Sequence, residues 1–286
     1  MVASDDRLAS SVGVEVMRQG GNAVDAAVAV GFALAVTYPE AGNLGGGGYM
    51  VIRMANGRVA ALDYRETAPL AAPRDMYIGA DGNVTGESVI GPRASGVPGA
   101  VAGMVEAQRK FGALPLARVL APAIRLAADG FIVDSALSRS LADHKYRIEG
   151  FTGKSVFFPN GEPPAVGSRL VQPQLARTIR LIAQGGSAAF YQGSIADSIA
   201  AEMRRSGGLI TKADLARYRA IWREPIRNSY RGYTYLAMPP SSGGGTTVTE
   251  LLNILEAYGP SAPFGSAERI HAVASASQRA FMDRNS

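Results

Sequence analysis

The stretch GNLGGGGYMVIRMANGRVAALDYRE, residues 42–66, predicts a glycine-rich loop followed by a β-hairpin. Two strand-like runs, 49–54 and 58–64, are separated by Asn56-Gly57. This dipeptide suits the two positive φ angles of a type I′ turn, so we expect the runs to pair through that turn. The second strand then delivers Asp63-Tyr64-Arg65-Glu66 to its exit, where side chains commonly face a functional site.

Two helices are predicted before this stretch. The first covers 8–18 and ends at Gly20-Gly21, a typical helix stop. Asn22 is a good N-cap for the second helix, and Asp25 stands three residues later, as in a capping box. The run 26–36 is small and apolar on every face, which is typical of a helix buried inside a protein.

Beyond residue 66 the pattern predicts a turn-rich segment, 71–98, and then mostly helices. Residues 230–237 are strand-like, and 239–245 form a second flexible loop. Because no repeat, low-complexity tract or linker interrupts the chain, we expect a single domain, mixed α and β, over 1–286. The predicted helices are 99–110, 115–129, 135–144, 174–185, 194–205, 212–218, 246–258 and 267 to the end, with Thr211 and Asp214 as a capping-box pair before 212–218.

The composition is that of a folded protein and excludes several classes of function. Of 286 residues, 47% are hydrophobic, so the chain can bury a sizeable core. The net charge of +5 comes from scattered basic residues, and we expect no nucleic-acid partner. The most apolar stretch, 23–36, is too short to span a bilayer, so we expect no membrane span. The first residues lack the basic and apolar regions of a signal peptide.

Metal and thiol chemistry have few candidate residues. The chain has no cysteine, which excludes disulfides, thiolate metal sites and a cysteine nucleophile. Its two histidines, His144 and His271, cannot build a histidine-rich metal site. We interpret His144 as a solvated helix end and His271 as part of an alanine-rich helix, and we expect no metal site.

The glycine-rich loops invite an anion-binding interpretation, because successive N–H groups can cradle a phosphate. The loop 45–48, however, precedes a strand, and 243–245 lacks the spacing of a dinucleotide motif. Tight packing near a site is therefore the preferred interpretation of both loops.

Three charged residues follow the predicted hairpin. The guanidinium of Arg65 offers a planar fork that suits a substrate carboxylate, although the residues alone favour a structural ion pair. Asp63 and Glu66 could form a carboxylate pair for acid/base chemistry, or one of them neutralises Arg65. For Glu66 we favour an ordinary surface charge.

Two pairs of hydroxyl residues adjoin the second glycine loop. Ser241-Ser242 and Thr246-Thr247 could supply a nucleophile or part of an oxyanion hole. No histidine or lysine lies near them in the sequence to act as a base. We therefore interpret Thr246 as the N-cap of a helix that begins at Val248.

Six ordered segments resemble the large subunit of the γ-glutamyltransferase family. They span nearly the whole chain, and together they are far more specific than any single glycine motif. The segments are GGNAVDAAVA at 20–29, GNLGGGG at 42–48, DYRETAP at 63–69, SGVPG at 95–99, GGLIT at 207–211 and PSSGG at 240–244.

The resemblance implies an N-terminal-nucleophile hydrolase of the α+β class, a four-layer αββα sandwich completed by a small subunit. In this family one precursor cuts itself, and the new N-terminal threonine of the small subunit is the nucleophile, with its own α-amine as base. It implies no cofactor and no catalytic residue in this chain. Arg65 matches the arginine that pairs with the α-carboxylate of the γ-glutamyl group, so we expect it to bind substrate.

The same resemblance implies the partners and the location. The substrate is glutathione or another γ-glutamyl compound, and the acceptor is water, an amino acid or a peptide. The small subunit from the same precursor is the implied protein partner, and the implied location is periplasmic or secreted. The segment 280–286 resembles a point inside the large subunit, before the self-cleavage site. We therefore expect residues 1–286 alone to be inactive.

Two alternatives stay open. Cephalosporin acylases share these large-subunit segments and cleave glutaryl or related acyl groups. Their substrates lack the γ-glutamyl combination of α-amine and α-carboxylate, so Arg65 favours the transferase without excluding the acylase. A non-catalytic module that binds an anion at 45–48 is the more distant alternative.

Overall fold

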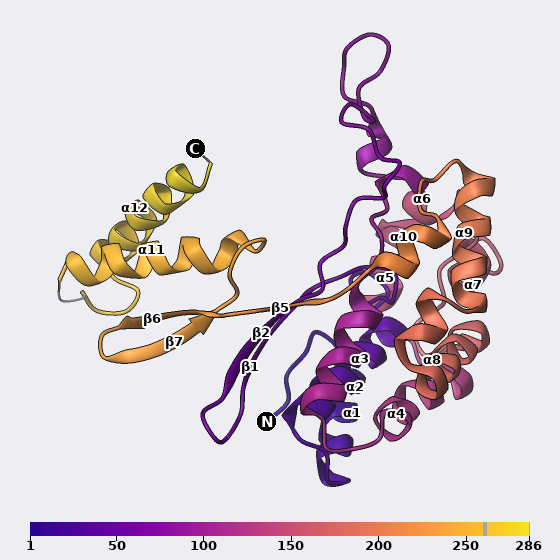
Figure 1. The fold of residues 1–286 in the computed structure, drawn as a ribbon, viewed down its shortest axis with the longest axis horizontal. Helices are drawn as coiled ribbons and strands as arrows, with labels where there is room; N and C mark the ends of the chain where they lie inside the picture. The colour runs from indigo at the N-terminus through magenta and orange to yellow at the C-terminus, as the bar shows by residue number, and fades with distance from the viewer. Residues whose placement is uncertain (260–261, 286) are drawn as a thin grey trace. The chain divides into compact units, whose positions relative to one another are not determined.

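The computed structural model describes residues 1–259 and 262–285, and the chain divides into two compact units. Unit 1 contains Met1–Gly48 and Tyr64–Ala220, and unit 2 contains Tyr49–Asp63 and Ile221–Ser286. Figure 1 labels the helices and strands of both units. A division into compact units does not decide how many domains a chain forms, so the single domain over 1–286 stays a prediction.

Unit 1 begins with the two predicted helices, α1 (Arg7–Arg18) and α2 (Ala23–Thr37). α2 carries the predicted capping box. Asn22 Oδ1 accepts the N–H of Asp25, and Asp25 Oδ2 accepts the N–H of Asn22. Most side chains of α2 are buried, and α1 and α4 (Leu116–Asp129) pack against it. The prediction of a buried helix is confirmed.

Two further helices complete the core of unit 1. α3 (Ala100–Phe111) packs on α2, and α8 (Pro173–Tyr191) packs on α4. The predicted end of the last of these helices at residue 185 agrees with a break in the helix, because Gly186 has a non-helical φ of +60°. A short second helical stretch follows this kink to Tyr191, and it buries Phe190 and Tyr191.

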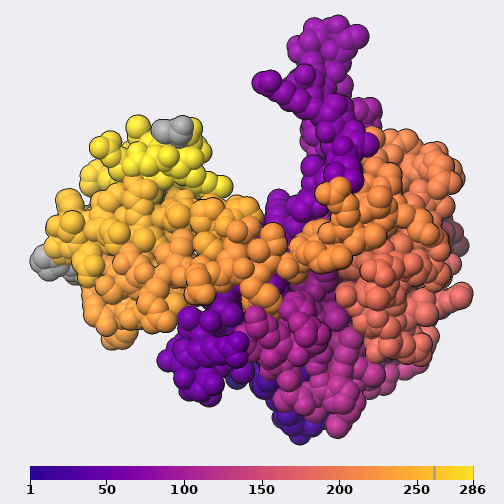
Figure 2. Space-filling view, viewed as in Figure 1, coloured from indigo at the N-terminus to yellow at the C-terminus, as the bar shows by residue number. Residues whose placement is uncertain are grey.

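Shorter elements fill the rest of unit 1. The predicted turn-rich segment 71–98 contains turns, isolated bridges and the 3-10 helices η1 (Gly86–Ser88) and η2 (Pro92–Ala94). In Figure 2 this segment, coloured purple, projects from the helices of unit 1. The remaining elements of unit 1 are β3 (Phe131–Ile132), α5 (Ser135–Asp143), α6 (Lys145–Ile148), α7 (Lys154–Phe157), β4 (Arg169–Leu170), α9 (Ser194–Ser206) and α10 (Lys212–Arg217).

The predicted hairpin forms, but its turn differs from the expected one. β1 (Tyr49–Arg53) pairs antiparallel with β2 (Val59–Asp63). The type I′ turn is wrong, because Gly57 has a positive φ of +82° and Asn56 does not. Hydrogen bonds from the Gly57 N–H to the Met54 carbonyl and from the Met54 N–H to the carbonyl of residue 58 match a three-residue loop with a glycine bulge. The additional loop residue lets Asn56 keep an ordinary negative φ.

Unit 2 contains this hairpin and the C-terminal part of the chain. β5 (Ile221–Arg223) pairs with β2, giving a sheet of order β1-β2-β5. The strand predicted over 230–237 corresponds to β7 (Tyr233–Ala237). The prediction missed the preceding strand β6 (Ile226–Tyr230), which pairs with β7 after the chain reverses at residues 231–232. Two helices follow, α11 (Gly243–Ala257) and α12 (Ala267–Arg284), and the predicted helix to Ser286 reaches a position outside the described residues.

Candidate functional site

Three of the six segments that carry the resemblance meet in unit 1. The backbones of Gly48 and Tyr64 exchange two hydrogen bonds, at 3.0 and 3.2 Å. The Gly46 carbonyl accepts the N–H groups of Gly99 and Ala100 at 2.7 and 2.8 Å. Thr67 pairs in the same way with residue 97. The segments 42–48, 63–69 and 95–99 therefore form one connected main-chain framework, which supports the tight-packing interpretation of the first glycine loop.

The ring of Tyr64 is fixed inside this framework by two glycines. A Cβ atom at Gly103 would lie 2.1 Å from Tyr64 Cγ, and one at Gly48 would lie 2.9 Å from Tyr64 Cε2. Any larger residue at 103 would collide with the rigid base of the ring. Burial raises the pKa of the Tyr64 hydroxyl above its ordinary value. The residue before Arg65 is thus anchored against α3.

Arg65 extends from this framework toward solvent. Its side chain is 63% exposed, and its Nε lies 3.3 Å from Glu66 Oε2. Contact through Nε orients the guanidinium plane, because the carboxylate approaches it from one edge. Arg65 therefore combines an anchored main chain with an accessible planar cation, the arrangement needed to recognise a carboxylate.

Glu66 is half-buried rather than an ordinary surface charge. Its side chain is 30% exposed, and its Oε2 atom is enclosed. A Cβ at Gly47 would lie 2.8 Å from that oxygen, and one at Gly96 would lie 2.8 Å from Glu66 Cβ. The sequence-based interpretation missed this burial because the two glycine segments that enclose Glu66 are distant from each other in sequence.

Asp63 has a different partner, within unit 2. It is 6% exposed, and Arg223 Nε on β5 donates to its Oδ2 at 2.8 Å. Ser241 Oγ donates to the same oxygen at 3.2 Å and lies 3.1 Å from the hydroxyl of Tyr49. Asp63 is therefore a charge-paired structural carboxylate, and Glu66 is the one beside Arg65. No pattern in the sequence pointed to Arg223.

The threonines of α11 bond to their own helix. Thr246 and Thr247 both donate from Oγ1 to the Gly243 carbonyl, at 3.0 and 2.8 Å. The expectation that Thr246 caps a helix beginning at Val248 is wrong, because α11 begins at Gly243. A Cβ at Gly245 would lie 2.1 Å from the carbonyl oxygen of residue 238, so this glycine permits close packing of the first turn.

Both histidines lie where the sequence placed them, at a helix end and within a helix, but His144 is half-buried rather than solvated. His144 follows α5, and its Nδ1 lies 2.9 Å from the Ser140 carbonyl oxygen. His271 is an exposed residue of α12. In the described ranges 1–259 and 262–285, no group of three or more His, Asp and Glu side chains could hold a metal ion.

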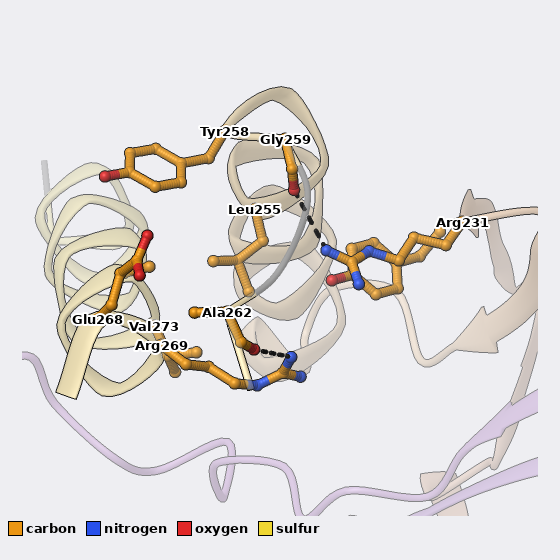
Figure 3. Close-up of a pocket in the computed structure, with 10 residues that line it drawn as sticks. Arg231, Leu255, Tyr258, Gly259, Ala262, Glu268, Arg269 and Val273 are labelled. Atoms are coloured by element: carbon orange, nitrogen blue, oxygen red, sulfur yellow. Dashed lines mark hydrogen bonds between the residues drawn. The ribbon is translucent and has the colours of Figure 1, made fainter. Parts of the chain in front are cut away.

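Cavities occur in both units. In unit 1 a groove of about 830 Å³ lies where the loop after α2 meets α7 and the start of α8. In unit 2 a pocket of about 40 Å³ lies between α11 and α12, where Arg231 donates to the Gly259 carbonyl and Arg269 to the Ala262 carbonyl (Figure 3). That volume suits a water molecule rather than a substrate.

Among the described residues, no helix has the length and apolar character required to cross a membrane.

Comparison with known proteins gives the family. The family model described as gamma-glutamyltranspeptidase matches residues 9–286. The chain is 48% identical to the glutathione hydrolase proenzyme of Escherichia coli, covering 100% of this chain and 50% of that protein. It is 43% identical to the acylase ACY 1 proenzyme of Pseudomonas sp. strain V22, covering 99% and 52%.

A solved structure, the gamma-glutamyltranspeptidase of Helicobacter pylori, superposes with a TM-score of 0.97 at 43% identity, covering 100% of this chain and 83% of that one. The chain therefore has the mixed α and β fold of the N-terminal-nucleophile hydrolases. It spans about half the length of the curated relatives it matches. The framework around Arg65 and these matches together identify the chain as a member of the γ-glutamyltranspeptidase family.

Proposed function

We propose that this chain is the large-subunit part of a self-processing γ-glutamyltransferase. The enzyme cleaves the γ-glutamyl amide bond of glutathione or a related compound and transfers the acyl group to water, an amino acid or a peptide. Support comes from the family match and from curated relatives described as glutathione hydrolase proenzymes, of which the chain covers half. The proposal needs no cofactor.

The chemistry proceeds through an ester on the small subunit. The hydroxyl oxygen of its N-terminal threonine attacks the γ-carbonyl carbon, and the threonine's own α-amine takes the hydroxyl proton. The C–N amide bond then breaks, and the leaving amine departs with that proton. Water or an acceptor amine then attacks the ester carbon and gives a proton of its own to the threonine's α-amine. The ester C–O bond breaks, the product is released, and the α-amine passes that proton to the threonine oxygen. In this scheme the present chain supplies substrate binding rather than the nucleophile.

Arg65 is the observation on which the proposal depends. Its guanidinium is accessible, is oriented by Glu66 at 3.3 Å, and follows the anchored Tyr64. A planar cation of this kind suits two parallel hydrogen bonds to the α-carboxylate of a γ-glutamyl group. Such a contact selects donors that carry this carboxylate and places the γ-carbonyl at a fixed distance from it.

The proposed partner is the small subunit of the same precursor. Unit 2 exposes a set of large apolar side chains, an unusual surface for a chain that acts alone. A second polypeptide that completes the sheets of the sandwich would cover such side chains. They are Val51, Ile221, Tyr233, Val248, Tyr258, Phe264, Ile270, Val273, Phe281 and Met282.

An acylase that removes glutaryl groups is the second candidate, and the similarity to the acylase ACY 1 proenzyme favours it. The expectation that Arg65 favours the transferase over the acylase is wrong, because a carboxylate-binding arginine suits both substrates. A glutaryl group keeps a carboxylate at the position of the γ-glutamyl α-carboxylate and lacks only the amine. The group that recognises the amine must therefore decide the substrate, and the resemblance assigns that group to the small subunit.

The test uses the Arg65→Lys variant of the full-length gene product that carries this chain. Lysine keeps the charge but loses the planar fork, so we expect KM for a γ-glutamyl anilide to rise about tenfold, with kcat changed less. Arg205→Lys is the matched control, because Arg205 is an exposed arginine whose Nε binds Glu202. An unchanged KM in Arg65→Lys would remove Arg65 from the site.

Activity on a glutaryl anilide, measured beside the γ-glutamyl anilide, distinguishes the two candidates. A preference for the γ-glutamyl compound supports the transferase, and the reverse preference supports the acylase. The proposed location, periplasmic or secreted, follows from the resemblance, and cell fractionation of the native host tests it.

A further inference from the structure

Arg65 is held through its main chain as well as through its side chain. The hydroxyl of Tyr218 donates a hydrogen bond to the Arg65 carbonyl oxygen at 2.8 Å. Tyr218 is 6% exposed and directly follows α10, so this bond is shielded from solvent. Glu66 orients the guanidinium of Arg65, whereas Tyr218 fixes the position of the Arg65 main chain.

Gly99 provides the space that this bond requires. A Cβ atom at position 99 would lie 2.1 Å from the Tyr218 hydroxyl oxygen and 2.0 Å from the Tyr64 carbonyl oxygen. Neither oxygen could keep its position beside such an atom. The glycine therefore allows the hydroxyl to approach the main chain of residue 65.

Tyr218 is itself fixed by its neighbours. Its ring stacks on that of Tyr191, with centroids 5.7 Å apart and planes 11° apart. The Tyr191 hydroxyl donates to the Pro98 carbonyl at 2.8 Å, which ties the stacked pair to the segment before α3. A phenol held in this way has little freedom to follow a shift of Arg65.

A second contact ties α10 to the segment that contains Arg65. Asp214 Oδ1 accepts the N–H of Leu70 at 2.8 Å, and its Oδ2 accepts the N–H of Thr211. Burial opposes ionisation of Asp214, but hydrogen bonds from Thr211 and Leu70 outweigh it and lower the pKa of this carboxyl. The carboxylate therefore stays charged at neutral pH and ties α10, the helix that Tyr218 follows, to the chain just after Arg65.

We propose that Tyr218 is a positioning residue for substrate binding, which acts by holding the Arg65 carbonyl so that the guanidinium meets the α-carboxylate of the donor. The inference depends on the proposed role of Arg65. Tyr218 does not touch the substrate in this proposal, so its removal affects the affinity for donors that carry the carboxylate and leaves the chemical step unchanged.

The test is Tyr218→Phe in the full-length gene product, which removes the hydroxyl and keeps the stacked ring. We expect KM for the γ-glutamyl anilide to rise about three- to tenfold, the effect of one neutral hydrogen bond, with kcat within about twofold. The 4-aminobutyryl anilide is the same compound without the α-carboxylate. Its kcat/KM should not change in the variant, because Arg65 has no group to bind there.

Tyr77→Phe is the matched control. The Tyr77 hydroxyl also donates to a main-chain carbonyl, that of Arg93, at 2.9 Å, but the bond does not involve Arg65. We expect this variant to keep the KM of the parent enzyme. Melting temperatures of both variants show whether either change acts through stability instead.

The double variant Arg65→Ala/Tyr218→Phe completes the design. If Tyr218 acts through Arg65, the tyrosine change adds nothing to KM once Arg65 is gone. If Arg65→Ala alone leaves KM unchanged, the proposed function of Arg65 fails. If Arg65→Ala raises KM but Tyr218→Phe does not, or Tyr218→Phe affects both anilides equally, only the positioning role is overturned.

Discussion

Asp25 connects α2 to the end of α3 through one buried carboxylate. The side chain is fully buried, and its Oδ2 accepts the N–H groups of Asn22 and Ala113 at 3.0 and 2.7 Å. Gln108 Nε2 donates to Oδ1 at 3.3 Å. A buried carboxylate is tolerated when its oxygens are satisfied in this way, and removing it would leave these donors without an acceptor.

We therefore expect Asp25→Ala to lower the free energy of unfolding of the full-length gene product by about 2–4 kcal/mol. Asp197→Ala is the control, since Asp197 is an exposed carboxylate paired with Lys212, and such a pair contributes about 0–1 kcal/mol. Urea unfolding followed by circular dichroism measures both. Equal effects of the two substitutions would contradict the proposed role of Asp25.

At this scale the sequence predicted only what is local. The bond between Asn22 and Asp25 spans three residues, and the capping-box pattern revealed it. Arg65 was a candidate from its place after the predicted hairpin, and the resemblance then favoured substrate binding over a structural ion pair. Tyr218 lies 153 residues from Arg65, and Arg223 lies 160 from Asp63. Neither pairing has a spacing rule, because only the folded chain brings these side chains together.

Among the elements, α3 depends on a glycine for its approach to the site. Glycine inside a helix normally costs about 1 kcal/mol relative to alanine. At Gly103 this cost is offset because the ring of Tyr64 packs against the helix in the space that a Cβ atom would occupy. Gly103 thus lowers the intrinsic stability of α3 but leaves the space in which the ring of Tyr64, the residue before Arg65, packs.

Gly103→Ala should therefore destabilise the protein, by about 1–3 kcal/mol, despite the better helix propensity of alanine. Displacement of Tyr64 should also raise KM for the γ-glutamyl anilide. Gly31→Ala in α2 is the comparison, because there the new Cβ meets mainly the sulfur of Met104, the movable part of a flexible side chain. Thermal unfolding and steady-state kinetics measure both variants, and a Gly103→Ala protein more stable than the parent would contradict the argument.

The observed boundaries of helices and strands agree with the predicted ones where capping residues and hydrophobic periodicity are strong. They differ from the predicted ones at glycines. The buried helix after Asn22 was predicted because its apolar character and its cap agree. The sequence did not predict the turn type at Asn56-Gly57 or the start of α11 at Gly243. Glycine accepts several backbone conformations, and tertiary contacts decide between them. The same ambiguity led the first glycine loop to be weighed as an anion site, although it packs against main chain.

For the whole molecule, the sequence-based prediction relied on the order of six segments rather than on any one of them. Four of them lie wholly in unit 1, the segment 63–69 lies there except for Asp63, and 240–244 belongs to unit 2. Main-chain hydrogen bonds within unit 1 join 42–48, 63–69 and 95–99. The connection between these segments is a property of the fold, so composition and periodicity alone reached only a mixed α and β protein. Unit 2 exposes large apolar side chains, which the proposed small subunit would cover.

At the scale of the whole molecule, we predict that the precursor cleaves itself into two chains. Because the nucleophile of the proposed reaction is the N-terminal threonine of a second polypeptide, we expect the purified full-length gene product to contain two chains. Intact-mass analysis under denaturing conditions, with N-terminal sequencing of the smaller chain, should find threonine as its first residue. Replacing that threonine with alanine should leave one uncut and inactive chain, because the same hydroxyl starts both the cleavage and the γ-glutamyl transfer. A single uncut chain with full activity would overturn the proposed mechanism.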